Sequence, residues 1–116
     1  MAYVQGWLVP VRTDKRDAYR KMAAEAAALW KENGAVSVTE CWGDDVPEGK
    51  VTSFPLAVKL EEGETVVFSW AVWPSKAARD AGMAKVLADP RMRPTGEEPF
   101  SMQRMIFGGF EAIVEA

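Results

Sequence analysis

One carboxylate lies in the middle of an apolar segment and is the residue best suited to chemistry in this sequence. Glu40 is followed directly by Cys41 and Trp42. Burial there would raise the pKa of its carboxyl group toward a value useful for proton transfer. The functional interpretation is that Glu40 is a general base or acid facing an aromatic pocket, with Arg104 of the last strand near it to stabilise negative charge. The alternative is that Arg104 or solvent simply satisfies Glu40 at a barrel rim or a dimer interface.

Tryptophan side chains supply the apolar surroundings that such a site needs. We expect Trp7, Trp42 and Trp70 to shape a pocket for a small apolar or aromatic ligand, and Ser69, the neighbour of Trp70, to line it. Aromatic residues also fill ordinary cores, and the chain has five Trp and five Phe. The same residues therefore also fit a filled, structural interior.

The sequence gives no strong signal for a metal or a cofactor. Asp44, Asp45 and Glu48 offer oxygen ligands for a divalent cation, but their spacing matches no calcium loop and suits an ordinary turn. Cys41 has no adjacent cation to favour its thiolate, so we expect a small buried hydrophobe. The chain has no histidine, which excludes Ser-His-Asp, Cys-His and histidine-ligated metal sites. We predict no metal and no cofactor.

Length and composition indicate one globular domain. The chain has 116 residues, 48% of them hydrophobic, and its 14 basic and 17 acidic side chains give a net charge of −3. A chain of this size buries about two-thirds of its unfolded surface, so it needs no disulfide. The lone Cys41 and the absence of signal-peptide features at the start favour the cytoplasm. Without excess basic charge or a stretch of about 18 apolar residues, we expect neither a nucleic-acid nor a membrane partner.

Hydrophobic periodicity predicts four main strands and two helices. The predicted strands are residues 3–11, 35–42, 65–73 and 104–114, and the predicted helices are residues 15–33 and 76–88. We expect a further short strand at Leu56–Leu60, forming a hairpin with the third main strand. Gly108-Gly109 in the last strand indicates a β-bulge or tight helix-to-sheet packing. The order strand, helix, strand, strand, helix, strand predicts one ferredoxin-like α+β domain over residues 1–116.

The predicted strands are apolar on both faces, and this points to an assembly. Two helices cover only one face of a four-stranded antiparallel sheet, yet neighbouring residues such as Trp7 and Leu8, or Ile106 and Phe107, are all apolar. A second copy packed sheet to sheet would cover the other face and enclose a barrel-like interior. We therefore predict a homodimer.

Long segments of the chain resemble a bacterial protein family. They read ECWGDDVPEGKVT from Glu40, VVFSW from Val66, WPSK from Trp73, DPRM from Asp89 and RMIFGGFE from Arg104. These segments are similar to the YbaA-like family of uncharacterised bacterial proteins, and the resemblance covers nearly the whole chain. It implies the dimeric α/β-barrel superfamily, whose members include cofactor-free quinol monooxygenases, small-molecule isomerases, haem degraders and ligand-sensing domains.

Two classes of function follow from these features, and we expect the first, with the second as the alternative. In the first, the protein is a homodimer whose interior holds a small apolar or aromatic molecule without transforming it, or is purely structural. In the second, it is a cofactor-independent monooxygenase or isomerase that uses Glu40 as base and Arg104 as the charge-stabilising group. A fold shared with enzymes does not decide between them.

Overall fold

The computed structural model describes residues 2–116 as one four-stranded sheet with two long helices. The strands are β1 (Tyr3–Arg12), β2 (Ser37–Trp42), β3 (Glu64–Trp73) and β4 (Ile106–Glu111). The long helices are α1 (Arg16–Glu32) and α3 (Lys76–Ala88). Short helical turns occur at Thr13–Lys15, Phe54–Ala57 (α2) and Pro90–Met92. The main strands and helices agree with the predicted ones, apart from shifts at their ends.

The sheet has the strand order β2-β3-β1-β4, and all neighbouring strands are antiparallel. Both crossovers run through a long helix, α1 between β1 and β2 and α3 between β3 and β4. This is the ferredoxin-like α+β fold, as predicted from the order of elements.

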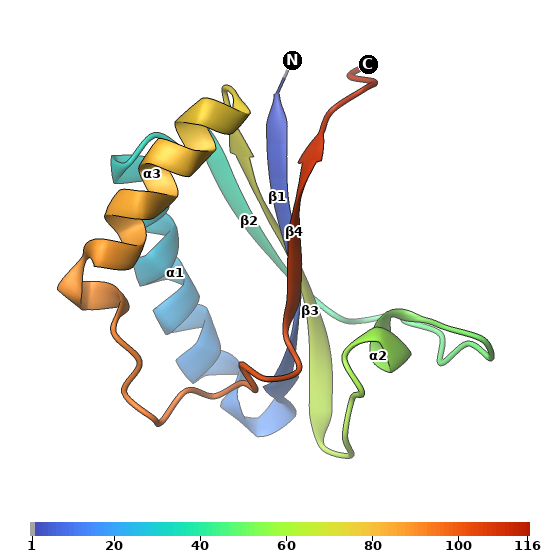
Figure 1. The fold of residues 1–116 in the computed structure, drawn as a ribbon. Coiled ribbons are helices and arrows are strands. Elements are labelled where there is room, and N and C mark those ends of the chain that lie inside the picture. Colours follow the sequence, from blue (N-terminus) through green and yellow to red (C-terminus); the bar gives the residue numbers. More distant parts are fainter. Residues whose placement is uncertain (1) are drawn as a thin grey trace.

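Both long helices lie on the same side of the sheet, whereas the short helix α2 lies on the other side (Figure 1). The helix ends follow local chemistry. Gly34, with φ of +112°, follows α1, and the Ser75 hydroxyl accepts a hydrogen bond from the Ala78 amide at 3.0 Å to begin α3. Because α1 and α3 share one side, the sheet has a covered face and an open face.

Side chains alternate between these two faces along each strand. On the covered face, the buried core contains Val9, Val11 and Val67 of the sheet with Tyr19 and Ala23 of α1, and a second cluster contains Ala35, Ala71 and Trp73. The residues of the open face are Val4, Gly6 and Leu8 of β1, Thr39 and Cys41 of β2, Phe68, Trp70 and Val72 of β3, and Ile106, Gly108 and Phe110 of β4.

The predicted strand at Leu56–Leu60 is wrong. Residues Phe54–Ala57 form one helical turn instead, in which the Ser53 hydroxyl accepts a hydrogen bond from the Leu56 amide at 3.1 Å and Pro55 lies in the first turn. Ser at the N-cap followed by Pro is a helix start signal, and this local chemistry outweighs the apolar character of the segment. The predicted hairpin with β3 is therefore also wrong: among residues 2–116, the strands that pair with β3 are β1 and β2.

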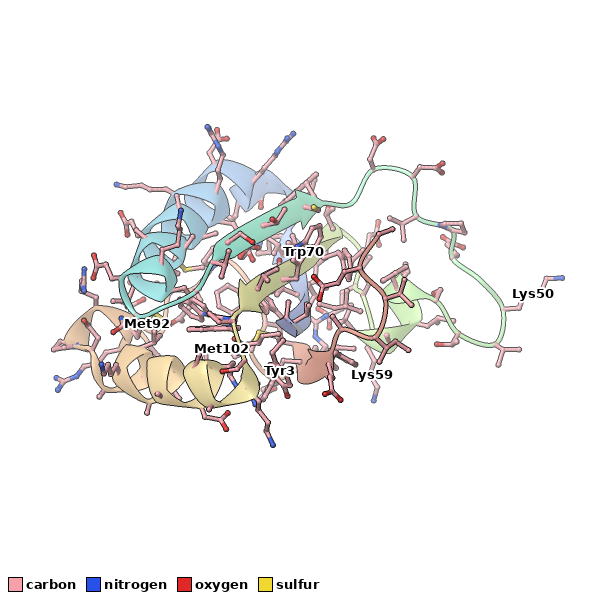
Figure 2. The ribbon with its side chains drawn as sticks, turned by 90° about the horizontal axis from the view of Figure 1, so that it is seen from above. Tyr3, Lys50, Lys59, Trp70, Met92 and Met102 are labelled. Carbon is pink, nitrogen blue, oxygen red and sulfur yellow. The ribbon has the colours of Figure 1, made fainter. Side chains whose placement is uncertain are left out.

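Residues 43–63 instead form an arm that extends from the open side of the sheet. In Figure 2, Lys50 lies at the end of this arm that is farthest from the two long helices. The arm contacts the open face where the rings of Phe54 and Phe68 meet edge to face, with centroids 5.8 Å apart.

The glycine pair of β4 forms no bulge. Gly108 pairs with Gly6 and Gly109 with Gln5 in continuous register. A Cβ atom on Gly109 would collide with the ring and hydroxyl of Tyr3. Gly109 thus makes room for an aromatic side chain of the neighbouring strand β1, which differs from the helix-to-sheet packing that was the predicted alternative to a bulge.

Candidate functional site

Glu40 lies on the covered face, where two hydroxyl groups bind it. The Tyr19 hydroxyl of α1 donates a hydrogen bond to Oε1 of Glu40 at 2.7 Å, and the Ser69 hydroxyl of β3 donates to the same oxygen at 2.5 Å. Ser69 is fully buried and Tyr19 nearly so, whereas Glu40 is half-buried. Within residues 2–116, Oε2 of Glu40 accepts no hydrogen bond and no Lys or Arg forms an ion pair with Glu40.

The sheet register explains why these groups meet. Glu40 of β2 pairs with Ser69 of β3, and Ser69 pairs on its other side with Trp7 of β1. All three side chains therefore point to the covered face in one row across the sheet. Trp42 lies on the same face two residues along β2, about 6.6 Å from Glu40. The structure thus places Glu40, Ser69, Trp7 and Trp42, four of the predicted site residues, on one face of the sheet.

Tyr19 completes the site and was not among the predicted site residues. The spacing of α1 places Tyr19 on its apolar stripe, where an aromatic residue is expected to serve the core. Its hydroxyl is the one signal that could have identified it, because a buried phenol normally has a hydrogen-bond partner. Burial, and then the charge of Glu40, raise the pKa of Tyr19 well above its ordinary value. Tyr19 is therefore a neutral hydrogen-bond donor.

Arg104 does not lie beside Glu40. Its guanidinium donates two hydrogen bonds to the Glu64 carboxylate at 2.7 and 2.6 Å, and further ones to the carbonyl oxygens of Lys59 at 3.1 Å and Val58 at 3.4 Å. Glu64 lies five residues before Ser69 on β3, about 17 Å along the strand. The expected Glu40–Arg104 contact is therefore absent, and Arg104 attaches the end of the arm to the sheet.

The ion pair of Arg104 changes the acid–base properties of its partner. Hydrogen bonds from the guanidinium lower the pKa of Glu64, whose side chain is 9% exposed. The same bonds raise the pKa of Arg104. Both groups therefore stay charged at neutral pH and act as a structural clamp between β3 and the arm.

Trp70 is separated from the other predicted pocket residues, because it points to the open face. There it helps to line a shallow hollow of about 450 Å³, together with Val4, Gly6, Phe68, Val72 and Phe110. Figure 2 labels Trp70 on its strand. The predicted single pocket thus divides into a polar cluster around Glu40 on the covered face and an apolar hollow around Trp70 on the open face.

Two of the three candidate metal ligands lie at a second hollow, whereas Glu48 is not among its lining residues. Asp44 and Asp45 line a space of about 230 Å³ at the start of the arm, with Cys41 and Phe54 among the other lining residues. In the part of the chain that the structure describes, no group of three or more acidic, His or Cys side chains is arranged to hold a metal ion. None of the helices in residues 2–116 has the length and hydropathy that a membrane span requires.

Comparisons with known proteins identify relatives and a similar fold. The protein is 58% identical over 116 residues to uncharacterized protein YbaA of Escherichia coli strain K12, and equally to YbaA of Shigella flexneri, with 99% of each chain covered. Its fold is similar to the crystal structure of SnoaB, a cofactor-independent oxygenase from Streptomyces nogalater, with a TM-score of 0.61 and 17% identity. That match covers 98% of this chain and 95% of SnoaB, and at this identity it shows the fold alone.

The sequence family follows from the extent of these matches. The family model described as protein of unknown function, DUF1428, matches residues 2–104. Together with 58% identity to YbaA over the full length, this match confirms the predicted resemblance to the YbaA-like family. The chain belongs to the DUF1428 family of YbaA-like proteins.

Proposed function

We propose that two copies of this protein pack open face to open face and hold a small apolar or aromatic molecule between their sheets. The observation that carries this proposal is the open face itself. Phe68, Phe110 and Ile106 are 47%, 60% and 43% exposed on it, and its strand positions from Val4 to Leu8 in β1 and Phe68 to Val72 in β3 carry no charge. A large exposed apolar patch on a globular domain marks an interaction surface.

A second copy is the partner that fits this surface best. The patch is apolar across β1, β3 and β4, Ser37 and Thr39 of β2 add small polar groups at one edge, and Arg12 pairs with Glu64 at one end of the β1–β3 register. An apolar face of this kind is complementary to itself, and a two-fold axis lets each sheet cover the other. The resemblance to the dimeric α/β-barrel superfamily supports the same arrangement.

The hollow on this face supplies the ligand site. Gly6 of β1 pairs with Gly108 of β4, and neither has a side chain to fill the space above the two strands. The ring of Phe110 lies over both glycines, 3.5 Å from where a Cβ of Gly108 would be and 3.8 Å from that of Gly6. With Trp70 and Phe68 beside it, the hollow presents aromatic and aliphatic surface, which suits an uncharged aromatic or aliphatic ligand.

A cytoplasmic location fits a protein with a single cysteine.

Native mass spectrometry of the freshly purified protein tests this proposal. We expect a dimer with an added mass that denaturation releases. Trp70→Ala should lose the added mass, whereas Trp42→Ala, which alters a tryptophan of the covered face, should keep it. A dimer that carries no added mass and binds no aromatic compound would reduce the proposal to a structural assembly, and a monomer would contradict it.

A second candidate function is that of a cofactor-independent monooxygenase or isomerase. The observation that favours it is Oε2 of Glu40, which accepts no hydrogen bond within residues 2–116 and so is free to take a proton. The fold likeness to SnoaB, an oxygenase, is compatible with this function. Arg104 is bound to Glu64 and would contribute no charge to the reaction. A folded Glu40→Gln variant that turns over a substrate as fast as the wild type would exclude Glu40 as the base.

A further inference from the structure

The arm of residues 43–63 carries apolar side chains that its own chain leaves exposed. Val51 is 98% exposed, and Phe54 and Leu56 are 49% and 48% exposed. All three lie within six residues, on the segment that stands away from the sheet on its open side (Figure 1). Exposed apolar side chains that gather on one segment indicate a surface that another molecule covers.

The arm is fixed to the sheet at both of its ends. At its start, the Gly43 amide donates a hydrogen bond to a carbonyl oxygen of β3 at 2.9 Å. Near its end, the guanidinium of Arg104 donates to the carbonyl oxygens of Val58 and the next residue, and the side chain of Val58 is 1% exposed. The arm therefore holds Val51, the neighbour of Lys50, away from the two long helices (Figure 2).

The open face alone is small for a stable dimer. Its uncovered part spans four strands about 4.8 Å apart and about five residues of each strand, which gives a footprint of roughly 300 Å². Side chains make the accessible area larger than this footprint, yet stable interfaces bury about 800 Å² on each partner. A ligand in the hollow would also take up part of the footprint. The arm lies on the same side of the sheet and supplies further apolar surface.

The arm of the same copy does not cover the hollow of the open face. All six residues that line this hollow belong to β1, β3 and β4. The arm joins the sheet where β2 ends and β3 begins, whereas Val4 and Val72, which pair across β1 and β3, line the hollow near the other end of these strands. A cover for the hollow must therefore come from elsewhere.

A second copy can bring its arm to the hollow. A two-fold axis that crosses the strands between two packed sheets places the arm of one copy at the far end of the strands of the other. The arm runs out and back with about ten residues in each direction, which can extend up to about 33 Å. Packed sheets lie only about 10 Å apart, so the arm is long enough to reach the other copy.

We propose that the arm of each copy crosses to the other copy and closes its hollow, with Val51 and Leu56 as the covering side chains. This inference rests on the proposed dimer and deepens it. The ligand site is then built from two chains, because β1, β3 and β4 of one copy form its floor and the arm of the other copy forms its cover. A single copy has an incomplete site.

Replacing the most exposed side chain of the arm tests this contact. Val51 is 98% exposed, so Val51→Asp removes almost no contact within its own chain and should leave the fold unchanged. In the dimer it would bury a carboxylate against apolar surface, and we expect sedimentation to show a rise of about tenfold or more in the dimer dissociation constant. Leu87→Asp is the matched control, because it changes a 72% exposed aliphatic residue of α3 on the helix side. It should have no effect.

Photo-cross-linking between labelled and unlabelled copies shows where the arm lies. A 15N-labelled Val51→p-benzoylphenylalanine protein would be mixed with unlabelled wild-type protein, left to exchange subunits and irradiated. We expect cross-links from the labelled arm to the unlabelled tryptic peptides 1–12, 60–76 and 105–116, which contain the residues that line the hollow. The same substitution at Leu87 should give no cross-links between copies.

The outcomes separate this inference from the dimer on which it rests. A wild-type monomer would overturn both. A dimer that Val51→Asp does not weaken, or cross-links from position 51 that stay within one chain, reach only helix peptides or do not form, would overturn the role of the arm and leave the face-to-face dimer intact.

Discussion

The phenol of Tyr19 and the carboxylate of Glu40, 21 residues apart in sequence, are joined by a hydrogen bond of 2.7 Å. This bond links α1 to β2, and Ser69 extends it to β3. Because every buried polar group of this kind needs its partners, the three side chains act as one unit. Loss of Glu40 would leave both hydroxyls without this acceptor, and loss of either hydroxyl would leave Oε1 with a single donor.

Tyr19 should make the protein sensitive to alkaline pH. Its pKa is raised in the folded protein, whereas an unfolded tyrosine loses its proton near about pH 10. Its contribution to stability is therefore present below about pH 10 and is lost as the pH rises from there toward the folded pKa. Urea unfolding measured at increasing alkaline pH should show the decline.

The Tyr19→Phe variant is the control for this prediction. It should be less stable at neutral pH by about 1–2 kcal/mol, because a hydrogen bond to a charged group is lost. It should also lose less stability than the wild type as the pH rises. If both proteins decline in parallel, Tyr19 is not the group responsible.

The ion pair between Arg104 and Glu64 should account for part of the stability that the folded protein loses at acidic pH. The pKa of Glu64 is lowered in the folded protein, so its contribution is present above its ordinary value of about 4.3 and is lost as the pH falls through the folded value. Arg104→Met should cost about 1–3 kcal/mol at neutral pH, because Glu64 loses its charged partner. The variant should show a shallower decline in acid.

An exposed ion pair provides the control for the Arg104→Met variant. Arg12 and Asp14 are 3.3 Å apart but 62% and 67% exposed, so Arg12→Met should change the free energy of unfolding very little. Equal effects of the two substitutions in chemical denaturation would contradict the structural role assigned to Arg104.

Gly82 should tolerate no side chain. A Cβ atom there would lie 2.5 Å from the Asn33 carbonyl oxygen and 2.5 Å from Cζ3 of Trp73. Gly→Ala inside a helix ordinarily stabilises by up to about 1 kcal/mol, but overpacking here should destabilise by roughly 1–3 kcal/mol. The loss of stability caused by Gly82→Ala should be smaller in a Trp73→Phe background, because that substitution removes the nearest ring atoms. A double-mutant cycle, with thermal unfolding as the readout, measures this coupling between the two positions. A stabilised Gly82→Ala protein would show that α3 does not pack this closely.

The secondary structure was predictable largely because periodicity and capping agree in most of the chain. The apolar stripe of α1, Ser75 before α3 and the alternation that places Glu40 and Trp42 on one face all appear in the structure. The arm was not predicted correctly, since Ser53 and Pro55 impose a helical turn on a segment whose apolar residues resemble a strand. In this segment, the N-cap serine and the following proline determine the local structure more strongly than the apolar residues do.

The composition of the site was only partly predictable, because partners across a sheet depend on register. Ser69 and Trp70 are neighbours on one strand, and successive side chains of a strand point to opposite faces of the sheet. The prediction that both residues line one pocket was therefore inconsistent with the strand predicted for the same residues. The partner of Arg104 depends on the path of the arm, which no periodicity encodes. Tyr19 required the packing of α1 on β2, which the sequence does not specify.

Sedimentation velocity at micromolar concentration tests most directly whether the open face pairs with a second copy. We predict a dimer for the wild-type protein and a monomer for Phe68→Lys, which places a charge in the centre of the open face. Leu87→Lys, at a 72% exposed position on α3, should remain a dimer. A compact wild-type monomer, or a Phe68→Lys protein as dimeric as the wild type, would contradict the account.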